Sequence, residues 1–326
     1  MRFARLHTLV VSASLVCAGV AAPTQAAPVN GPVTIMVGFA PGGAADTTAR
    51  LYAEALRQHG FETVVVENKP GASGRIALNA VKSAKPDGLT MYLGGSPLFA
   101  IFPLTYKKLD YDADKDLRPV AQLVEIPTGV VAAKAAPYDG IADYIQWAKA
   151  QGKPTTLGVA TLGSAGHLGA LALNKSQGLQ IEPVAYKGAA PMLVDVASGE
   201  VSIGWDAVAS MMPLYRSGKI KFLGISGTKR MQALPDVKTI DEQGFQEYRA
   251  ATSWYGIFVP AATPDDVVAR LEHAFLKVSE DAGLRNRLLD AGMVVAPAGS
   301  ADTARRIAEE RKQWAPIVEA SGIAMD

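Results

Sequence analysis

One segment of the sequence combines the residue types that can hold an anion without a charged side chain. It reads Val37-Gly-Phe-Ala-Pro-Gly-Gly-Ala-Ala-Asp46, with two adjacent glycines between an apolar run and an aspartate. Glycine allows a tight turn and leaves the backbone bare, and the first amides of a helix carry a partial positive charge. A strand that ends before Gly42 and a helix that begins at Asp46 therefore predict an anion cradle of main-chain N–H groups. Asp46 could itself serve the helix dipole or meet a donor group of a ligand.

A second segment, Thr161-Leu-Gly-Ser-Ala-Gly-His167, has a similar composition. Ser164 could cap the following helix or donate its hydroxyl to a carboxylate, and the cap is the more common role. His167 falls in the first turn of that helix. The helix dipole disfavours its protonated form there, which favours a structural role over a cationic clamp.

Further polar residues follow other expected strands. Ser96 comes after Gly94-Gly95 in what reads as a bare loop, and Tyr186-Lys187 and Asp206 each precede an expected helix. Lys187 could be the counter-charge of a ligand or a solvated lysine, and Asp206 could cap the helix after it. The pair Trp254-Tyr255 could line a cleft or fill a core.

Sequence signatures of catalysis are missing. Ser164 lacks the glycine two residues earlier that a nucleophile elbow requires, and neither G-x-G-x-x-G nor a Walker A motif occurs. The histidines after the leader lack zinc-ligand spacing. We therefore expect no catalytic residue, no metal and no cofactor. The enzymatic alternative is an exported hydrolase or isomerase that uses Asp46 or Asp206 with His167. A third alternative is a protein that presents its ligand to a signalling sensor.

The first 26 residues resemble a secretory signal peptide. Arg2 and Arg5 precede a short apolar segment, and Thr24-Gln25-Ala26 offers small residues for cleavage between Ala26 and Ala27. Lipoprotein processing at Cys17, the only cysteine, is a weaker alternative because Leu15-Val16 fits a lipobox poorly. The remaining chain contains 30 basic and 31 acidic residues. This near-neutral balance argues against a nucleic-acid partner.

Strand and helix signals alternate along the whole chain from Val33. The expected strands are 33–37, 62–67, 89–93, 117–124, 129–133, 155–159, 182–185, 201–205, 220–226 and 254–259, and the expected helices are 46–56, 73–81, 141–150, 164–173, 190–197, 264–278, 282–291 and 301–317. This alternation predicts an α/β protein with mostly parallel sheets and helices on both faces. Two crossings predict two lobes with a ligand cleft between them: 27–126 and 252–326 form the first lobe, and 127–251 form the second. The glycine loops fall at the carboxyl ends of strands, where ligands of such sheets bind.

Several motifs resemble those of one protein family. The segment 37–50 resembles its opening V-P-F-x-P-G-G-x-x-D signature with a following A-R, and 66–74 matches V-E-N-x-x-G-A-x-G. Further matches are P-D-G at 86–88, G-S-x-x-H-L at 163–168, and Y-K-G-x-x-P at 186–191. In order and extent the chain resembles the Bug family, the substrate-binding proteins of tripartite tricarboxylate transporters. It departs at Gly38 and Ala40, where the family often has proline.

The resemblance implies a monomeric periplasmic protein that closes two lobes on a small carboxylate and delivers it to membrane permease subunits. Family ligands are di- and tricarboxylates, acidic amino acids and aromatic acids, held mainly by backbone groups and ordered waters. Carried over by motif, the binding residues are Phe39, Pro41, Gly42, Gly43, Ala44 and Asp46 in the first lobe, and Thr161, Gly163, Ser164, His167, Tyr186, Lys187 and Asp206 in the second. Ser96 is added to these candidates because it follows Gly94-Gly95 at the end of an expected strand.

Overall fold

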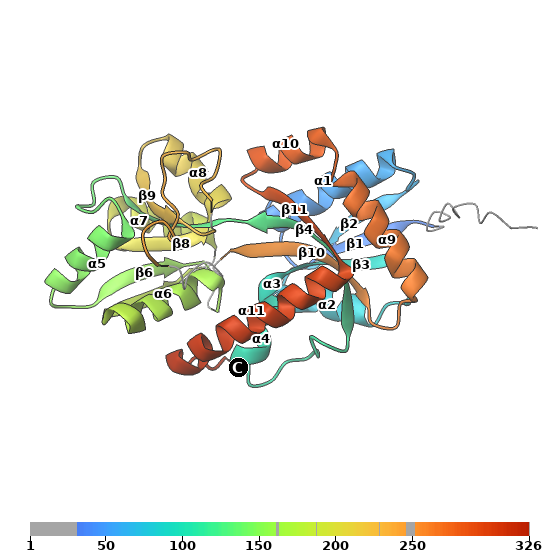
Figure 1. Ribbon diagram of the computed structural model, residues 1–326, viewed down its shortest axis with the longest axis horizontal. Coiled ribbons are helices and arrows are strands. Elements are labelled where there is room, and N and C mark those ends of the chain that lie inside the picture. The colour runs from blue at the N-terminus through green and yellow to red at the C-terminus, as the bar shows by residue number, and fades with distance from the viewer. Residues whose placement is uncertain (1–30, 161–162, 187, 228, 246–251, 326) are drawn as a thin grey trace, which may run out of the picture.

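The computed structural model describes residues 31–160, 163–186, 188–227, 229–245 and 252–325. The expected leader, Thr161 and Lys187 lie outside the described residues. Two α/β bodies lie side by side, and each is built on its own sheet (Figure 1). This confirms the α/β class and the two-lobed form.

The first body contains a six-stranded sheet in the order β11-β4-β10-β3-β1-β2. Its strands are β1 (Val33–Val37), β2 (Val64–Asn68), β3 (Thr90–Gly95), β4 (Leu117–Ile126), β10 (Ser253–Pro260) and β11 (Val294–Gly299). Its helices are α1 (Ala44–Gln58), the short η1 (Ala72–Gly74), α2 (Arg75–Lys82), α3 (Ser96–Ala100), α4 (Phe102–Thr105), α9 (Asp265–Val278), α10 (Ala282–Asp290) and α11 (Ser300–Ser321). Fully buried side chains on α1 and α9 pack beside this sheet.

The second body contains a five-stranded sheet in the order β7-β6-β8-β5-β9. Its strands are β5 (Thr128–Ala133), β6 (Thr155–Val159), β7 (Ile181–Ala185), β8 (Ile203–Ala207) and β9 (Ile220–Ile225). Its helices are α5 (Ile141–Ala150), α6 (Ala165–Gln177), α7 (Ala189–Ser198) and α8 (Val208–Arg216). Within the described parts of the chain, no helix is both long and apolar enough to span a bilayer.

Both sheets are mixed, which corrects the expectation of mostly parallel sheets. β1 pairs in parallel with β2 and β3, and β6 pairs in parallel with β7 and β8. By contrast, β10 is antiparallel to β3 and β4, β11 to β4, and β5 to β8 and β9. The physical reason is the crossing itself. The chain leaves the first sheet through β4 and returns through β10, so these neighbouring strands must run in opposite directions.

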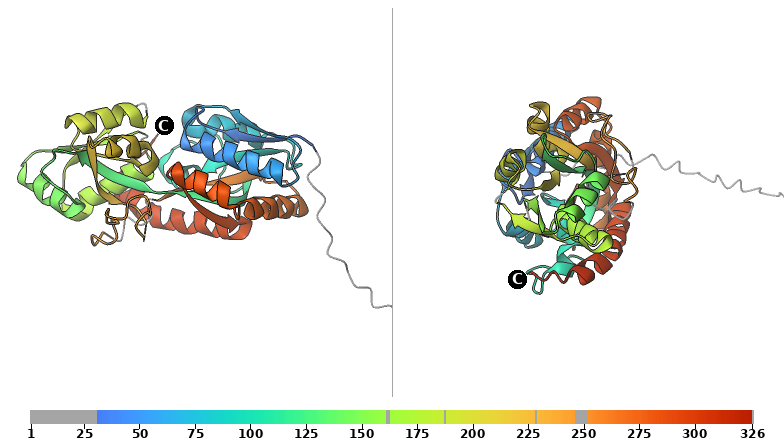
Figure 2. Two further views of the ribbon diagram at one scale, coloured as in Figure 1. Left: turned by 90° about the horizontal axis from the view of Figure 1, so that it is seen from above. Right: turned by 90° about the vertical axis from the view of Figure 1, so that its left-hand side faces the viewer.

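The chain first passes from one sheet to the other through a one-residue link, Pro127, which joins β4 to β5. Beside it, Ser253 at the start of the returning strand β10 is paired with Ile126. Helix α11 packs on β4 and α3 of the first body and on α6 of the second. In Figures 1 and 2, α11 runs along one side of both bodies. The bodies are thus joined by two adjacent strands and braced by one helix.

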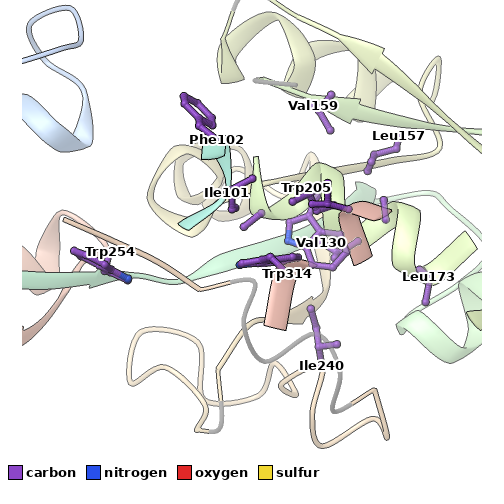
Figure 3. Packing of buried hydrophobic residues seen from close by; sticks show 14 of the residues in the cluster. Ile101, Phe102, Val130, Leu157, Val159, Leu173, Trp205, Ile240, Trp254 and Trp314 are labelled. Carbon is purple, nitrogen blue, oxygen red and sulfur yellow. The ribbon is translucent and has the colours of Figure 1, made fainter. Parts of the chain in front are cut away.

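A continuous apolar core runs from the first body into the second beneath these crossings. Figure 3 shows Trp205, Trp254 and Trp314 within it, together with Ile101 and Phe102. Trp254 is fully buried, and its Nε1 donates to Glu310 Oε1 at 2.8 Å. Trp254 is therefore a core residue, which settles one of the two roles that the sequence left open.

Candidate functional site

A cavity of about 190 Å³ lies between the two bodies. Its walls come from the ends of β3, β8 and the β4–β5 crossing, the start of α3 and α6, and the first residues of β10. The lining residues are Phe39, Ser73, Gly95, Pro97, Leu98, Phe102, Ile126, Thr128, Ser164, Ala165, Gly166, Trp205, Asp206, Ala207, Ser253 and Tyr255. A cleft between the lobes, at strand ends, is where the alternation of elements predicted it.

The first glycine loop contributes one of these lining residues, Phe39, whose side chain is 38% exposed. The residues Pro41, Gly42 and Gly43 are exposed and lie outside the lining. Helix α1 begins at Ala44, two residues before the expected start, and no side chain caps its N-terminus. No side chain therefore accepts a hydrogen bond from the first amides of α1. Amides that are free in this way are what an anion-binding helix N-terminus needs.

Asp46 braces this loop from inside. Its Oδ2 accepts from the Gly42 amide and from Arg50 Nε, each at 2.9 Å, and its Oδ1 accepts from Asn68 Nδ2 at 2.9 Å. Burial tends to raise the pKa of this carboxyl, but the hydrogen bonds from Arg50, Gly42 and Asn68 outweigh burial and the net pKa is lowered. Asp46 is almost fully buried and lies outside the cavity lining. In the described structure its contacts are those of a loop anchor.

The loop before α2 brings Ser73 to the cavity, a residue not among the expected binding residues. Ser73 was expected to cap α2, but that helix begins at Arg75 after Gly74, with no side-chain cap. Ala72 and Ser73 instead adopt left-handed conformations with φ of 46° and 55°. A Cβ on Gly38 would lie 2.4 Å from Gly74 Cα. The glycine at position 38 therefore permits this close approach of two loops.

The second glycine loop is held by its own side chains. Ser164 Oγ accepts from the His167 amide at 3.2 Å, so the predicted helix cap is confirmed. The Gly163 amide donates to His167 Nδ1 at 3.0 Å. Burial lowers the pKa of His167, and an accepting Nδ1 carries no proton. His167 is therefore a neutral brace of the loop, and neither it nor Gly163 lines the cavity.

Trp205 forms a wall of the cavity against the first turn of α6. A Cβ on Gly166 would lie 2.8 Å from Trp205 Cδ1 and 3.1 Å from its carbonyl oxygen. The indole Nε1 donates to Thr128 Oγ1 at 3.0 Å, which ties this wall to the crossing strand β5. Because Gly166 lacks a side chain, the backbone of the first turn of α6 can pack directly against Trp205.

Asp206 is the last residue but one of β8 and lines the cavity. Its Oδ1 accepts from the Ala207 amide at 2.7 Å, one residue before α8, and α8 has no side-chain cap. The proposed capping role is therefore wrong, because the carboxylate bonds the residue before the helix. Burial raises the pKa of Asp206 to about 6, and the Ala207 hydrogen bond acts in the opposite direction. Tyr255 also lines the cavity, and its pKa is raised by burial and, to a lesser degree, by the Asp206 charge.

Of the two remaining predicted residues, Ser96 lies beside the cavity lining and Tyr186 lies away from it. Ser96 Oγ is 3.3 Å from Ser253 Oγ, and Ser253 lines the cavity. Gly94 and Gly95 do not form the expected bare loop, because they are the last residues of β3. Tyr186 donates to Asp195 Oδ2 at 2.7 Å on α7, away from the lining.

Sequence reasoning missed most of the lining that comes from the crossing strands. Ile126, Thr128, Ser253 and Tyr255 meet at the cavity because β10 begins beside the point where β4 passes into β5, with Ser253 paired to Ile126. One local signal was available for these residues. Neighbours in a strand face opposite sides, so of the pair Trp254 and Tyr255 only one could face a cleft. Tyr255 is on the cavity side and Trp254 is in the core.

Of the three residues in the enzymatic alternative, Asp206 alone is part of the cavity lining. Asp46 and His167 are both engaged in loop hydrogen bonds and lie outside the lining. The described lining contains no Lys, Arg, His or Cys, and the described residues include no His, Cys, Asp and Glu cluster suited to a metal ion. The arrangement offers amides, hydroxyls, aromatic surface and one carboxyl, which suits binding.

Two α/β bodies joined by crossing strands around a lined cleft define a two-lobed solute-binding protein. The family model described as the tripartite tricarboxylate transporter family receptor matches residues 48–323. The chain belongs to this family, as its resemblance to the Bug proteins predicted.

Solved structures of relatives agree in fold over nearly their whole length. The R. palustris protein Rpa4515 with adipate is 31% identical, with a TM-score of 0.81 over 90% of this chain and 98% of that one. The periplasmic binding protein BugD is 30% identical, with a TM-score of 0.77 over 90% and 99%. MatC from Rhodopseudomonas palustris with bound malate is 30% identical, with a TM-score of 0.75 over 88% and 98%.

Proposed function

We propose that this protein is a periplasmic receptor that captures a small carboxylate between its lobes and delivers it unchanged to a tripartite tricarboxylate-type permease. The observation that carries the proposal is the cleft lining at the start of α6, where Ser164, Ala165 and Gly166, which has no side chain, line the cavity. Helix-start amides hold anions without a cationic side chain. Two relatives about 30% identical are described with the dicarboxylates adipate and malate.

The cavity size supports a small acid as the guest. Drug-sized ligands occupy cavities of roughly 300–1,000 Å³, and this one is about 190 Å³. Hydrogen bonds to a charged group contribute roughly 1.5–3 kcal/mol each. Micromolar affinity corresponds to about −8 kcal/mol. A few hydrogen bonds from amides and hydroxyls to the carboxylate are therefore enough for micromolar affinity.

We assign the direct contacts to Phe39, Ser164 and Asp206 among the predicted residues. The rim residues Pro41, Gly42, Gly43 and Ala44 follow Phe39, and the uncapped start of α1 stands among them. We propose that they reach the guest when the lobes close. Asp46, Ser96, Gly163, His167 and Tyr186 then hold these loops in shape. Thr161 and Lys187 remain predicted contacts outside the described residues.

Closure would turn about the crossing strands. We propose lobes of 27–126 with 252–326, and of 127–251, with the hinge at Pro127 and Ser253. The backbone there is held by local bonds, since the Thr128 amide donates to Ser226 Oγ at 2.9 Å and the Ser226 amide to Thr128 O at 2.8 Å. Hinges of this kind are a few residues at element ends that absorb the change in backbone angles.

Export is the second part of the proposal. The leader 1–26 would be removed between Ala26 and Ala27, releasing a monomer into the periplasm. N-terminal sequencing of the protein recovered from a periplasmic fraction would read Ala-Pro-Val-Asn if cleavage occurs there. A mature protein that begins at Cys17 with a lipid attached would replace this proposal with the lipoprotein alternative.

The binding proposal is tested by a thermal-shift panel of mono-, di- and tricarboxylic acids, acidic amino acids and aromatic acids. A guest at 100 times its dissociation constant stabilises the protein by about 2.7 kcal/mol. Calorimetry on each hit should give one site, and chromatography should recover the acid unchanged. A consumed acid would favour the hydrolase or isomerase alternative. Growth on the acid that survives deletion of the permease genes would favour a signalling role.

A further inference from the structure

Asp206 would repel an anionic ligand when it is ionised, because its carboxylate lies in the cleft and no cation among the described lining residues balances its charge. Of the described residues that line the cavity, Asp206 and Tyr255 are the two with ionisable side chains. The strands β5 and β6 on either side of β8 contain no ionisable residue. A carboxylate entering this space would meet a second carboxylate.

The charged groups on the surrounding helices are occupied or distant. On α6, His167 is neutral because its Nδ1 accepts a hydrogen bond from the Gly163 amide and the ring is buried, and Lys175 lies in the last turn, at the opposite end of the helix from the cavity lining. On α7, Asp195 accepts from the Tyr186 hydroxyl, and on α8 the one charged residue is Arg216 at the far end. Lys187 lies outside the described residues. The described surroundings of Asp206 therefore supply no positive charge to the cleft.

The geometry of Asp206 leaves one oxygen available. Oδ1 accepts from the Ala207 amide at 2.7 Å, which fixes the carboxyl group. Oδ2 accepts no hydrogen bond from any residue that the structure describes. The residue is anchored at the end of β8, where it pairs with Gly129. A proton on Oδ2 would turn this fixed, open acceptor into a hydrogen-bond donor.

We propose that Asp206 takes up one proton from solvent when a carboxylate enters the cleft, and that its neutral Oδ2–H donates a hydrogen bond to the guest. The inference rests on the carboxylate-binding function proposed above. The site would then select an acid whose end facing Asp206 carries an oxygen acceptor, such as a second carboxylate. It would discriminate against an ammonium group at that place.

The physical reason is that two carboxylates in contact inside a desolvated cleft cannot both stay ionised. Burial has already raised the pKa of Asp206 to about 6 in the ligand-free protein. An adjacent anion raises it further, because the charged form of Asp206 then meets a like charge. Binding and protonation are thus linked, and each pH unit above the ligand-free pKa weakens binding by up to about tenfold.

The test is calorimetry of the full mature protein with adipate, malate and aspartate between pH 5 and 8.5. At each pH above 6, paired buffers of different ionisation enthalpy report the number of protons taken up. We expect about one proton per adipate or malate at pH 7.5, and a dissociation constant that rises about tenfold from pH 7 to pH 8. Below pH 5.5 the affinity should level off.

Two variants locate the proton. Asp206→Asn keeps an N–H donor at the same place, so it should bind near the wild-type pH 5 affinity at every pH and take up no proton. The matched control Asp236→Asn removes an exposed carboxyl outside the cleft and should keep the wild-type pH dependence. Lys187 is itself a predicted contact, so Lys187→Gln is read only by the slope of the dissociation constant against pH. A slope equal to that of wild type shows that this lysine does not neutralise Asp206, and a lost slope overturns the inference.

The outcomes are separable. A pH-independent dissociation constant, with no buffer-dependent heat, would overturn the inference while leaving carboxylate binding intact. Tight binding of aspartate that strengthens with rising pH and is abolished in Asp206→Asn would mean that Asp206 stays ionised against a cation, and would also overturn it. Binding of no acid at any pH would refute the proposed function itself. If Asp206→Asn does not fold, the wild-type proton count alone decides.

Discussion

The wall between Trp205 and the first turn of α6 supports a prediction that can be worked out from distances. In Gly166→Ala the new Cβ would lie 2.8 Å from Trp205 Cδ1, 2.9 Å from Cγ and 3.1 Å from the carbonyl oxygen. Ordinary carbon contacts are about 3.5–4.0 Å, so either the indole or the helix start must move by roughly 0.7 Å. The indole is buried and bonded to Thr128, which leaves the helix start as the part that gives way.

We expect Gly166→Ala to lower both the stability of the fold and the affinity for the ligand. Overpacking destabilises by about 1–3 kcal/mol, and replacing a helical glycine returns about 1 kcal/mol, so the midpoint of thermal unfolding should fall by about 0–4 °C. Misplacing one amide bond to a charged guest loses about 1.5–3 kcal/mol. This corresponds to roughly ten- to hundredfold weaker binding, measured by calorimetry with adipate at pH 6.

The matched control is Gly158→Ala in β6, where a new Cβ would lie 2.6 Å from Met192 Cγ, outside the cavity lining. It should lower the unfolding midpoint in the same way and leave affinity within about twofold. If Gly166→Ala retains both wild-type affinity and wild-type stability, the helix start does not rest on Trp205 as described. Equal losses of affinity in both variants would mean that general destabilisation, and not the cleft wall, accounts for the effect.

Three further variants test the loops and the buried carboxyls. Asp46→Ala should destabilise by about 1–3 kcal/mol at pH 7, because the Gly42 amide and Asn68 lose their acceptor. Since the pKa of Asp46 is lowered, this contribution is present above the ordinary 3.8 and lost as the pH falls through the lowered value, so wild type and variant should converge in acid. Asp206→Asn should be more stable than wild type at pH 8 by up to about 3 kcal/mol, with the difference gone below pH 3.8. The sign follows from the raised pKa, because wild type loses stability as the pH rises through about 6. Ser73→Gly should be neutral or stabilising by up to about 1 kcal/mol, because glycine accepts the left-handed conformation that serine adopts at a cost. A fall of 3 °C or more in its unfolding midpoint would contradict the assigned backbone.

Local patterns in the sequence were sufficient for most elements. The strand 33–37, the helix 141–150 and the strand 155–159 were predicted with the bounds that the structure has. The cap at Ser164 was also predicted. A serine just before a helical segment bonds an amide of the first turn, here that of His167, and this contact depends only on residues nearby in the sequence. By contrast, β11 was missed, since its residues are exposed or half-buried and show no apolar alternation.

Tertiary structure decided which way the strands run and which residues meet at the cleft. Ser73, Thr128, Ser253 and Tyr255 come from segments far apart in the chain, and no local period marks them as neighbours. It also decided the partners of Asp46, whose oxygens accept hydrogen bonds from Gly42, Arg50 and Asn68.

The protonation of Asp206 likewise depends partly on the local sequence and partly on the tertiary structure. The sequence by itself determined a carboxyl after a strand and before a helix. Its depth in the cleft, the absence of a cation among the described lining residues and its raised pKa depend on how two sheets face each other. Propensity, capping and periodicity act over a few residues and can be read along the chain. Desolvation and charge pairing depend on atoms that only folding brings within a few ångströms.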